Sequence, residues 1–310
     1  MIVKIENLVK RYGDLIALDH LNLNINDGEI FGLLGPNGSG KTTTINCMLS
    51  LLKYDKGTIE IFGKKMTPSS YEIKRNIGIV MQNIAVFREL SVYENIDYFC
   101  GLYITDKNKR QQYIEDALEF TGLKEYEKCP AKKLSGGLMR RLNIACGIAH
   151  KPKLIILDEP TVAVDPQSRN HILQGIKQLN EAGATIIYTS HYMEEVEQLC
   201  TNIAIMDKGK IIAKGTKEEL KAMISLGEKV IVEAYSIDEA HINQLRALKD
   251  VLSVDYENNE LIIKSRNGSS NLIKVIDYIE KEKIHYGKIY SELPTLNDVF
   301  LEITGKELRD

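Results

Sequence analysis

The sequence predicts an α/β fold in which a buried parallel core sheet follows an antiparallel N-terminal sheet and precedes a small α+β domain. Apolar runs at residues 30–34, 154–157 and 185–189 lack polar alternation, which is typical of strands buried on both faces of a parallel sheet. Residues 21–26 alternate strictly between apolar and polar side chains, which indicates a sheet with one face in water. The glycine-rich stretch 35–43 separates one apolar strand from an amphipathic helix, so we expect a phosphate-binding turn there.

Composition limits the class of protein. The chain has 310 residues, of which 44% are hydrophobic and 27% charged, as in a soluble protein with one large domain and a smaller one. Its formal net charge of -3 does not favour general nucleic-acid binding. Its apolar runs fall far short of the roughly 18 residues that cross a bilayer, and its start lacks the apolar core of a signal peptide. The 5 cysteines include no C-x-x-C pair, so we expect a reducing, cytoplasmic location without disulfides or zinc.

The first strands are expected at residues 2–9 and 15–25, and a turn at Asp27-Gly28 leads into the apolar strand before the glycine-rich stretch. Tyr12 lies between these first two strands. Two interpretations of its ring stay open: a half-exposed strand aromatic, or a face on which adenine stacks.

Residues 35–43 match the phosphate-binding pattern G-x-x-x-x-G-K-[ST]. In such a turn, backbone N–H groups wrap a phosphate and the helix N-terminus adds its partial positive charge. Lys41 would reach the outer phosphates, and the Thr42 hydroxyl would ligate magnesium. A chance match in a flexible glycine loop is the alternative, and the strand and helix on either side disfavour it. The candidate nucleotide-binding residues of this loop are Gly35, Pro36, Asn37, Gly38, Ser39, Gly40, Lys41, Thr42 and Thr43.

A helical insertion is expected at about residues 88–150. It follows a strand at 76–82 that ends in the amide of Gln82. Ser91 and Glu94 form a capping box that starts its first helix, and a second helix stops at Gly122. Because this block separates Gln82 from the next apolar strand, we interpret it as an insertion that lies beside the sheet.

A third helix in this block opens with two glycines behind a serine. Ser135, Gly136 and Gly137 leave N–H groups and a hydroxyl free at the helix N-terminus, which suits a second anion. A plain serine cap followed by flexible glycines is the alternative.

Polar groups follow the ends of two buried strands. Residues 154–157 run into Asp158 and Glu159, and buried strands seldom end in two carboxylates unless a cation or a water needs them. Asp165 starts the following helix, and His191 lies just beyond the strand at 185–189. Ligands of open α/β sheets bind at the carboxyl ends of strands, so we expect these groups to converge.

Taken in order, these motifs resemble the nucleotide-binding domain of ATP-binding-cassette (ABC) transporters. The set comprises Tyr12, the phosphate loop, Gln82, the segments L-S-G-G and L-I-I-L-D-E-P, Asp165 and His191. The resemblance covers about residues 1–222 and implies a P-loop NTPase cassette with a parallel core sheet, an antiparallel N-terminal sheet and a helical insertion. The sequence contains no second phosphate loop, so a single cassette is expected.

The resemblance implies ATP and Mg²⁺ as cofactors and a role for each matching residue. Thr42, Gln82 and Asp158 would contact the metal, and Gln82 would also touch the attacking water. Glu159 is similar to the general base of the family, and His191 to the residue that reads the γ-phosphate.

The resemblance also implies a dimer in the ATP-bound state, either a homodimer or a heterodimer with a second cassette. Two departures lie at the implied dimer seam: Leu138 stands where the family often has Gln, and Ala163 replaces a glycine. Neither removes a catalytic group. The nucleotide-binding residues implied at this seam are Leu134, Ser135, Gly136, Gly137 and Asp165.

Residues 225–310 are expected to form a separate ferredoxin-like domain, because strands and helices follow in the order β-α-β-β-α-β. The tail at 293–301 resembles the end of cassette subunits from bacterial two-component exporters of drugs, antibiotics and peptides. A dimer brace without a ligand is the alternative role of this domain. A last helix after Pro294 is expected to pack through Leu296, Val299, Phe300 and Ile303.

The resemblance therefore implies an ATPase subunit that powers export through a separate transmembrane permease, held at the inner face of the cell membrane. The ATPase of an importer is one alternative, and the C-terminal tail speaks against it. A soluble ABC ATPase acting on the ribosome or DNA is another. Those proteins usually carry tandem cassettes, long coiled-coil insertions or basic extensions, so we expect no nucleic-acid partner.

Overall fold

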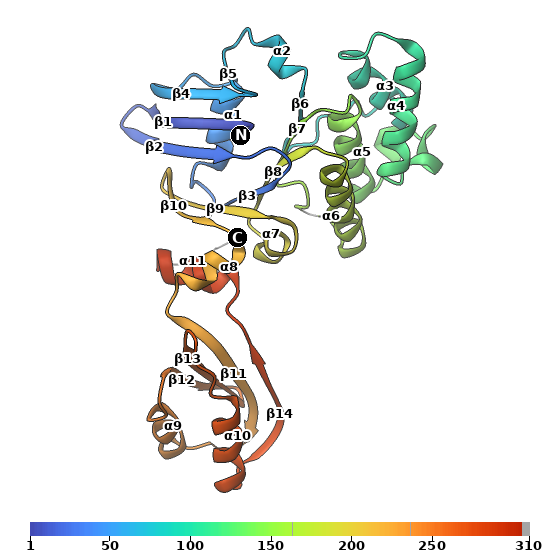
Figure 1. The fold of residues 1–310 in the computed structure, drawn as a ribbon. Coiled ribbons are helices and arrows are strands. Elements are labelled where there is room, and N and C mark those ends of the chain that lie inside the picture. The colour runs from blue at the N-terminus through green and yellow to red at the C-terminus, as the bar shows by residue number, and fades with distance from the viewer. Residues whose placement is uncertain (163, 236, 306–310) are drawn as a thin grey trace. The chain divides into compact units, whose positions relative to one another are not determined.

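The computed structural model describes residues 1–162, 164–235 and 237–305, which divide into two compact units (Figure 1). The first unit comprises Met1–Gly215, and the second comprises the described residues from Thr216 onward. The spatial division falls at Gly215 because helix α8 (Lys217–Ala222) packs against α11 (Leu296–Thr304). The domain limits 1–222 and 225–310 stay a prediction. Ala163 and residues 306–310 lie outside the described residues.

An antiparallel sheet with strand order β2-β1-β4-β5 opens the first unit. In β2, Leu21, Leu23 and Ile25 are buried and the residues between them are exposed, so the predicted one-sided sheet is confirmed. Its ladder pairs Val3 with Ile25 and Tyr12 with Leu15. The strands are β1 (Val3–Tyr12), β2 (Leu15–Ile25), β4 (Lys56–Ile61) and β5 (Lys64–Lys65), and the short helix α2 (Tyr71–Lys74) follows them.

The core sheet has the strand order β10-β9-β3-β8-β7-β6. Strands β3, β7 and β8 are buried along their whole length and pair in parallel, as predicted for strands covered on both faces. Helices α6 (Pro166–Glu181) and α7 (Met193–Leu199) pack against β8. The strands are β3 (Ile30–Leu34), β6 (Ile77–Val80), β7 (Leu154–Asp158), β8 (Thr185–Ser190), β9 (Asn202–Asp207) and β10 (Lys210–Gly215).

Helix α1 (Lys41–Met48) joins the two sheets. Ile45 and Met48 are buried in one hydrophobic cluster with residues of β1 and β3, such as Ile5 and Phe31. The helix ends at Met48, earlier than the predicted face that runs to Leu52, although Leu52 still packs on the same cluster. The phosphate loop is therefore anchored by the main core at both of its ends.

The helical insertion forms a block with a hydrophobic core of its own (green in Figure 1). It contains α3 (Val92–Gly101), α4 (Lys107–Phe120) and α5 (Gly136–Ile148), together with the 3₁₀ turns Lys124–Tyr126 and Ala131–Lys133. The predicted capping box is present, since Ser91 Oγ accepts from the Glu94 N–H and Glu94 accepts from the Ser91 N–H. Helix α5 packs against β6, which connects the block to the core sheet.

The second unit has the predicted β-α-β-β-α-β order. Its sheet is antiparallel with strand order β12-β13-β11-β14, the arrangement of a ferredoxin-like domain. Val230, Ile263 and Val275 are buried in its core. The elements are β11 (Leu226–Tyr235), α9 (Glu239–Arg246), β12 (Val251–Glu257), β13 (Glu260–Arg266), α10 (Leu272–Lys281) and β14 (His285–Glu292).

The last helix, α11, packs differently from the predicted face in its final turn. Leu296, Val299 and Phe300 are buried as predicted, whereas Ile303 is 36% exposed. Ile303 lies one residue before the end of the helix at Thr304, and Glu302 beside it accepts from the Ser225 N–H at 2.7 Å, so this turn contacts the unit through a polar residue.

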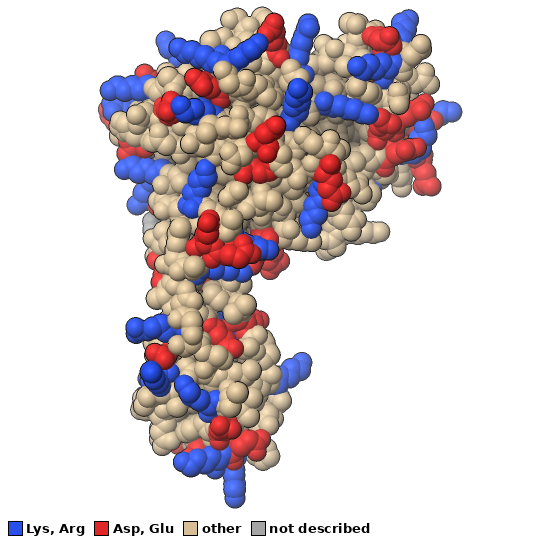
Figure 2. Space-filling view, in the orientation of Figure 1, with Lys and Arg blue, Asp and Glu red and all other residues tan. Residues whose placement is uncertain are grey.

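The surface carries charges of both signs. Figure 2 shows Lys and Arg interspersed with Asp and Glu on the visible face of each unit, without a broad area of one sign. Across the described ranges, no helix combines the length and the apolar character needed to cross a membrane.

Candidate active site

The glycine-rich loop leaves β3 at Leu34 and enters α1 at Lys41. Its last glycine, Gly40, is the N-cap of α1 with φ 108°, a conformation that L side chains rarely adopt. A Cβ at Gly40 would also lie 3.0 Å from the Ala17 carbonyl oxygen. Among the described side chains none caps this helix, so its first N–H groups are left for an anion.

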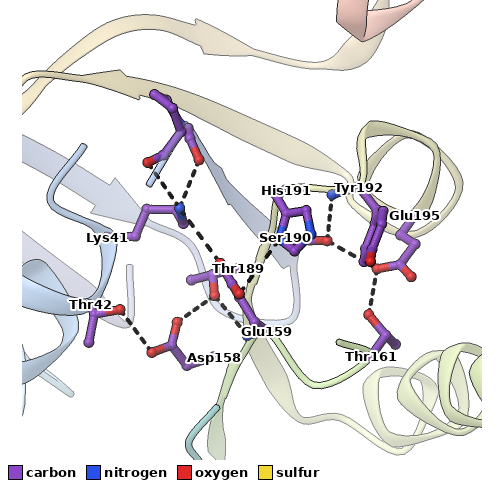
Figure 3. A network of polar contacts seen from close by, with 12 residues as sticks. Lys41, Thr42, Asp158, Glu159, Thr161, Thr189, Ser190, His191, Tyr192 and Glu195 are labelled. Atoms are coloured by element: carbon purple, nitrogen blue, oxygen red, sulfur yellow. Dashed lines mark hydrogen bonds and ion pairs between the residues drawn. The ribbon is translucent and has the colours of Figure 1, made fainter. Parts of the chain in front are cut away.

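Lys41 points back into the loop (Figure 3). Its Nζ donates to the Gly35 carbonyl oxygen at 2.7 Å and to that of Pro36 at 3.3 Å, and it lies 3.8 Å from Glu159 Oε1. Burial lowers the pKa of Lys41, and the neighbouring Glu159 and Asp158 partly offset this because their charges raise it. The loop thus holds a largely desolvated cation, whose attraction for a phosphate is stronger than in water.

Asp158 ends β7 and lies beside the start of α1. Its two carboxylate oxygens accept from Thr42 Oγ1 at 3.1 Å and from Thr189 Oγ1 at 2.6 Å. Mg²⁺ in nucleotide sites is commonly held by one or two protein oxygens together with substrate phosphates. The hydroxyl of Thr42 and the carboxylate of Asp158 therefore fit such an ion.

Glu159 follows Asp158 with φ 49°, a left-handed conformation that is rare for a residue with a side chain. Backbone strain of this kind costs about 1–3 kcal/mol and clusters at functional sites. Its N–H donates to Thr189 Oγ1 at 3.0 Å, and its Oε2 lies 3.6 Å from His191 Nδ1. In the described part of the chain, His191 Nδ1 has no hydrogen-bond partner. The Glu159 carboxylate is thus held between Lys41 and His191.

A cavity of about 420 Å³ opens over the loop. Tyr12, Gln82 and Glu159 line it together with the loop residues Asn37 to Thr43. The Tyr12 side chain is 49% exposed, and the Lys10 ammonium lies 4.9 Å from the centre of its ring. The structure therefore brings Tyr12, the loop, Gln82 and Glu159 to one cavity, with Asp158 and His191 directly behind.

The predicted second anion site is not part of this cavity. Ser135 caps α5, and its Oγ accepts from the Leu138 N–H at 3.3 Å. A Cβ at Gly137 would lie 2.9 Å from Asp165 Oδ2, so the N-termini of α5 and α6 are adjacent. Asp165 accepts from the Ser168 N–H at 2.9 Å, and this bond lowers the pKa of Asp165. The segment Leu134–Gly137 and Asp165 thus form a second polar cluster, in which Ser135, Gly136 and Asp165 are exposed.

Leu138, the first of the two departures from the family pattern, packs on the hydrophobic core of the helical block. The apolar side chain of Leu138 is therefore accommodated by contacts with the helical block of its own chain.

Two buried residues that contact the site, Arg140 and Glu195, were not predicted from the sequence. The buried guanidinium of Arg140 donates to the Gln82 carbonyl oxygen at 2.7 Å, and burial lowers the pKa of Arg140. Glu195 accepts hydrogen bonds from the hydroxyls of Thr161 and Ser190, which Figure 3 shows, and from that of Tyr188. A signal for Glu195 existed, because helical spacing places it on the same face as Leu199, which is buried.

Known families match both units. The ABC transporter family model matches residues 18–162, and a model described as the C-terminal domain of DrrA1-3-like ATP-binding proteins matches residues 215–304. The chain is 40% identical to the linearmycin resistance ATP-binding protein LnrL of Bacillus subtilis (strain 168), over 98% of this chain and 99% of that protein. It is 32% identical to the daunorubicin resistance ATP-binding protein DrrA3 of Streptomyces coeruleorubidus, over 99% of this chain and 97% of that one. The Nod factor export ATP-binding protein I of Cupriavidus metallidurans (strain ATCC 43123 / DSM 2839 / NBRC 102507 / CH34) shares 34% identity over 100% of this chain and 99% of its own.

Solved cassettes share the fold of the first unit. The dimeric ATP-binding cassette MJ0796, in a post-hydrolysis state bound to ADP and Pi, matches with a TM-score of 0.63 and 28% identity. The match covers 69% of this chain and 98% of that one. The chain therefore belongs to the ATP-binding proteins of ABC transporters and is an ATP-hydrolysing enzyme of that family.

Proposed function

We propose that this chain is the ATPase subunit of an exporter and drives transport through a separate transmembrane permease. The names of its relatives, which specify linearmycin resistance, daunorubicin resistance and Nod factor export, support export of drug-like or related compounds. The match of the second unit to the DrrA1-3-like C-terminal domain supports the same class. The observation that carries the ATPase assignment is the meeting of Lys41, Asp158 and Glu159 at the loop cavity.

ATP is proposed to bind along this cavity, with its adenine on the exposed ring of Tyr12 and its phosphates in the loop. Lys41 exchanges its contacts with the Gly35 and Pro36 carbonyl oxygens for the outer phosphates. Phosphoryl transfer needs positioning and charge neutralisation more than covalent help from the protein, and this arrangement supplies both.

Hydrolysis is proposed to use Glu159 as the general base. Glu159 takes a proton from the attacking water while the water oxygen bonds to the γ-phosphorus and the bond to the ADP oxygen breaks. His191 lies beside the carboxylate and holds the γ-phosphate, and Gln82 lines the same cavity and orients the water. Thr42, Asp158 and Gln82 would hold Mg²⁺, which would neutralise charge on the phosphates when bound.

The second polar cluster is proposed to bind the ATP of another protomer. Ser135, Gly136 and Asp165 are exposed and lie outside the cavity of their own chain, as a head-to-tail dimer requires. The dimeric cassette MJ0796 supports such an assembly, which here is a homodimer or a heterodimer with a second cassette.

Ser135→Arg is expected to fold and bind ATP as a monomer but to neither dimerise with ATP nor turn it over. The substitution places bulk and charge at the exposed helix N-terminus and leaves the phosphate loop unchanged. Loss of the serine cap costs about 0.5–2 kcal/mol, too little to unfold a domain of this size. Nucleotide affinity, size-exclusion chromatography with and without ATP, and ATPase rate measure the result.

Ser69→Arg is the matched control, because Ser69 is also exposed but lies outside the loop cavity and outside the second polar cluster. It should dimerise and hydrolyse ATP at the wild-type rate. Wild-type dimerisation of Ser135→Arg would refute the proposed role of this cluster in a partner's site.

Phe87→Asp is expected to abolish binding of the membrane subunit without affecting the fold or ATP binding. Phe87 lies between Gln82 and α3, its side chain is 45% exposed, and its ring contacts those of Tyr98 and Phe99. Asn95 accepts from the Phe87 N–H at 2.7 Å and donates to its carbonyl oxygen at 2.9 Å, so the backbone stays in place without the ring. In the family this region receives a helix of the membrane subunit, and an exposed aromatic cluster fits that contact.

The measurement is affinity capture of the tagged chain from detergent-solubilised membranes, followed by mass spectrometry. Tyr71→Asp is the control, because it removes another exposed aromatic ring in the same unit. Undiminished capture by Phe87→Asp would place the docking surface elsewhere. Capture of ribosomal proteins or DNA by the wild-type chain, in place of a membrane protein, would contradict the exporter proposal.

A further inference from the structure

Glu195 is a buried carboxylate that the proposed mechanism does not use. It lies on α7 and is 3% exposed. Its Oε2 accepts hydrogen bonds from Tyr188 OH at 2.6 Å, Thr161 Oγ1 at 2.8 Å and Ser190 Oγ at 3.1 Å. Its Oε1 lies 3.3 Å from Arg169 Nε. A buried carboxylate needs such partners, because burying it without them is costly.

Two partners of Glu195, Thr161 and Ser190, are close in the chain to the two catalytic candidates (Figure 3). Thr161 follows Glu159 by two residues, and Ser190 directly precedes His191. Ser190 Oγ also accepts from the Tyr192 N–H at 2.9 Å, which closes the turn that carries His191. One carboxylate thus joins the segment after β7 to the end of β8.

Arg169 extends the same network to α6. Its guanidinium lies 4.6 Å from the ring centre of Tyr192, next to His191. Arg169 is in the first turns of α6, which begins at the Asp165 cap. The carboxylate therefore also connects the His191 turn with the helix that starts at the second polar cluster.

We propose that Glu195 is a positioning residue for ATP hydrolysis, which keeps the Glu159 and His191 side chains in their relative arrangement. The proposal rests on the function proposed above. Glu195 is not among the residues that line the loop cavity, so it acts through its neighbours. Glu159 adopts a strained left-handed conformation that persists only where its surroundings enforce it. Its N–H donates to Thr189 Oγ1 in β8, and Thr161, two residues further along, donates to Glu195, so the chain is held on both sides of this turn.

The chemistry of the network requires a carboxylate at this position. Burial, and then the neighbouring Glu195, raise the pKa of Tyr188 well above its ordinary value, so its hydroxyl remains a donor. A glutamine offers one acceptor oxygen and one NH₂ donor. In one orientation the NH₂ group would face the Arg169 guanidinium, which has no acceptor. In the other, the hydroxyls of Tyr188, Thr161 and Ser190 would lose the oxygen to which they donate and would have to reorient as acceptors. Glu195→Gln therefore loosens part of the network while it keeps the size of the side chain.

The experiment compares steady-state ATPase kinetics of the full chain with those of Glu195→Gln and of Glu194→Gln. Glu194 is exposed on the same helix, so its substitution makes the same charge change outside the network. We expect kcat of Glu195→Gln to fall about tenfold or more, because small misplacements of catalytic groups have effects of this size. KM for ATP should stay within about twofold, because the phosphate loop is unchanged. Glu194→Gln should match wild type. A Glu195→Gln kcat within about twofold of wild type overturns the proposal.

A second experiment introduces Glu195→Gln into the Glu159→Gln chain and tests whether Glu195 acts through Glu159. In Glu159→Gln chains, measured by single turnover, addition of Glu195→Gln should cause a smaller loss than it causes in the wild-type chain, because the base is already absent and only the effect through His191 remains. A full additional loss overturns positioning through Glu159 and indicates a general structural role. Slow hydrolysis by Glu159→Gln together with wild-type kcat in Glu195→Gln overturns only the positioning proposal. A wild-type rate in Glu159→Gln refutes the assignment of the base, and the present proposal with it.

If Glu195→Gln does not fold, Tyr188→Phe decides by the same criteria. It removes one hydroxyl donor to Glu195 and preserves the ring in the core. Its expected effect is smaller, a severalfold fall in kcat with KM unchanged. An unchanged kcat in this variant overturns the proposal.

Discussion

Glu159→Gln is expected to bind ATP with wild-type affinity and to hydrolyse it about 10²–10⁴-fold more slowly, the usual contribution of a positioned base. The amide keeps the size of the side chain but cannot take a proton from water. The contacts of Asp158 with Thr42 and Thr189 do not involve Glu159, so binding is preserved. ATPase rate, nucleotide affinity and size-exclusion chromatography with ATP measure the outcome, and ATP should hold this variant as a stable dimer.

Glu181→Gln is the control for this experiment, because Glu181 is exposed at the end of α6 and makes the same charge change. It should hydrolyse ATP like wild type. Turnover of Glu159→Gln near the wild-type rate would show that Glu159 is not the base and that another group activates the water.

Lys41→Ala is expected to weaken nucleotide binding by roughly 10- to 100-fold, since a hydrogen bond to a charged group contributes about 1.5–3 kcal/mol. Within the described residues, Lys41 Nζ donates only to loop carbonyl oxygens and lies 3.8 Å from Glu159, so the change removes contacts within the site itself. Burial lowers the pKa of Lys41, so keeping this side chain charged in the loop lowers the free energy of unfolding. Removal should therefore leave the melting temperature unchanged or raise it.

Nucleotide titration and thermal unfolding of the same samples separate these two effects. Lys53→Ala serves as the control, because Lys53 is an exposed lysine that does not line the cavity. Wild-type affinity in Lys41→Ala would refute the assignment of the phosphate loop. Reduced affinity with a lowered melting temperature would indicate a structural effect on the loop instead.

The sequence alone determined the features that depend on local periodicity and short-range chemistry. The buried strands β3, β7 and β8 were recognisable because their sequences are apolar without polar alternation. The phosphate loop was recognisable because residues 35–43 match the pattern G-x-x-x-x-G-K-[ST] between a strand and a helix. The capping box of Ser91 and Glu94 and the β-α-β-β-α-β order of elements in the second unit follow from the same kind of signal. Each of these patterns depends on residues that are close together in the chain, so it can be recognised without knowledge of the fold.

Only the tertiary structure decided which of the candidate residues share a site and what holds them there. Tyr12, Gln82 and Glu159 come from distant segments, and they meet at the cavity because their strands end around the phosphate loop. Ser135 was predicted to take part in a second anion site, and it lies outside that cavity. Helical spacing indicates that Glu195 lies on the buried face of its helix, but it does not identify its partners, which come from β8 and from the segment after β7. Burial and hydrogen-bond partners depend on contacts between residues far apart in the chain, and periodicity carries no information about these.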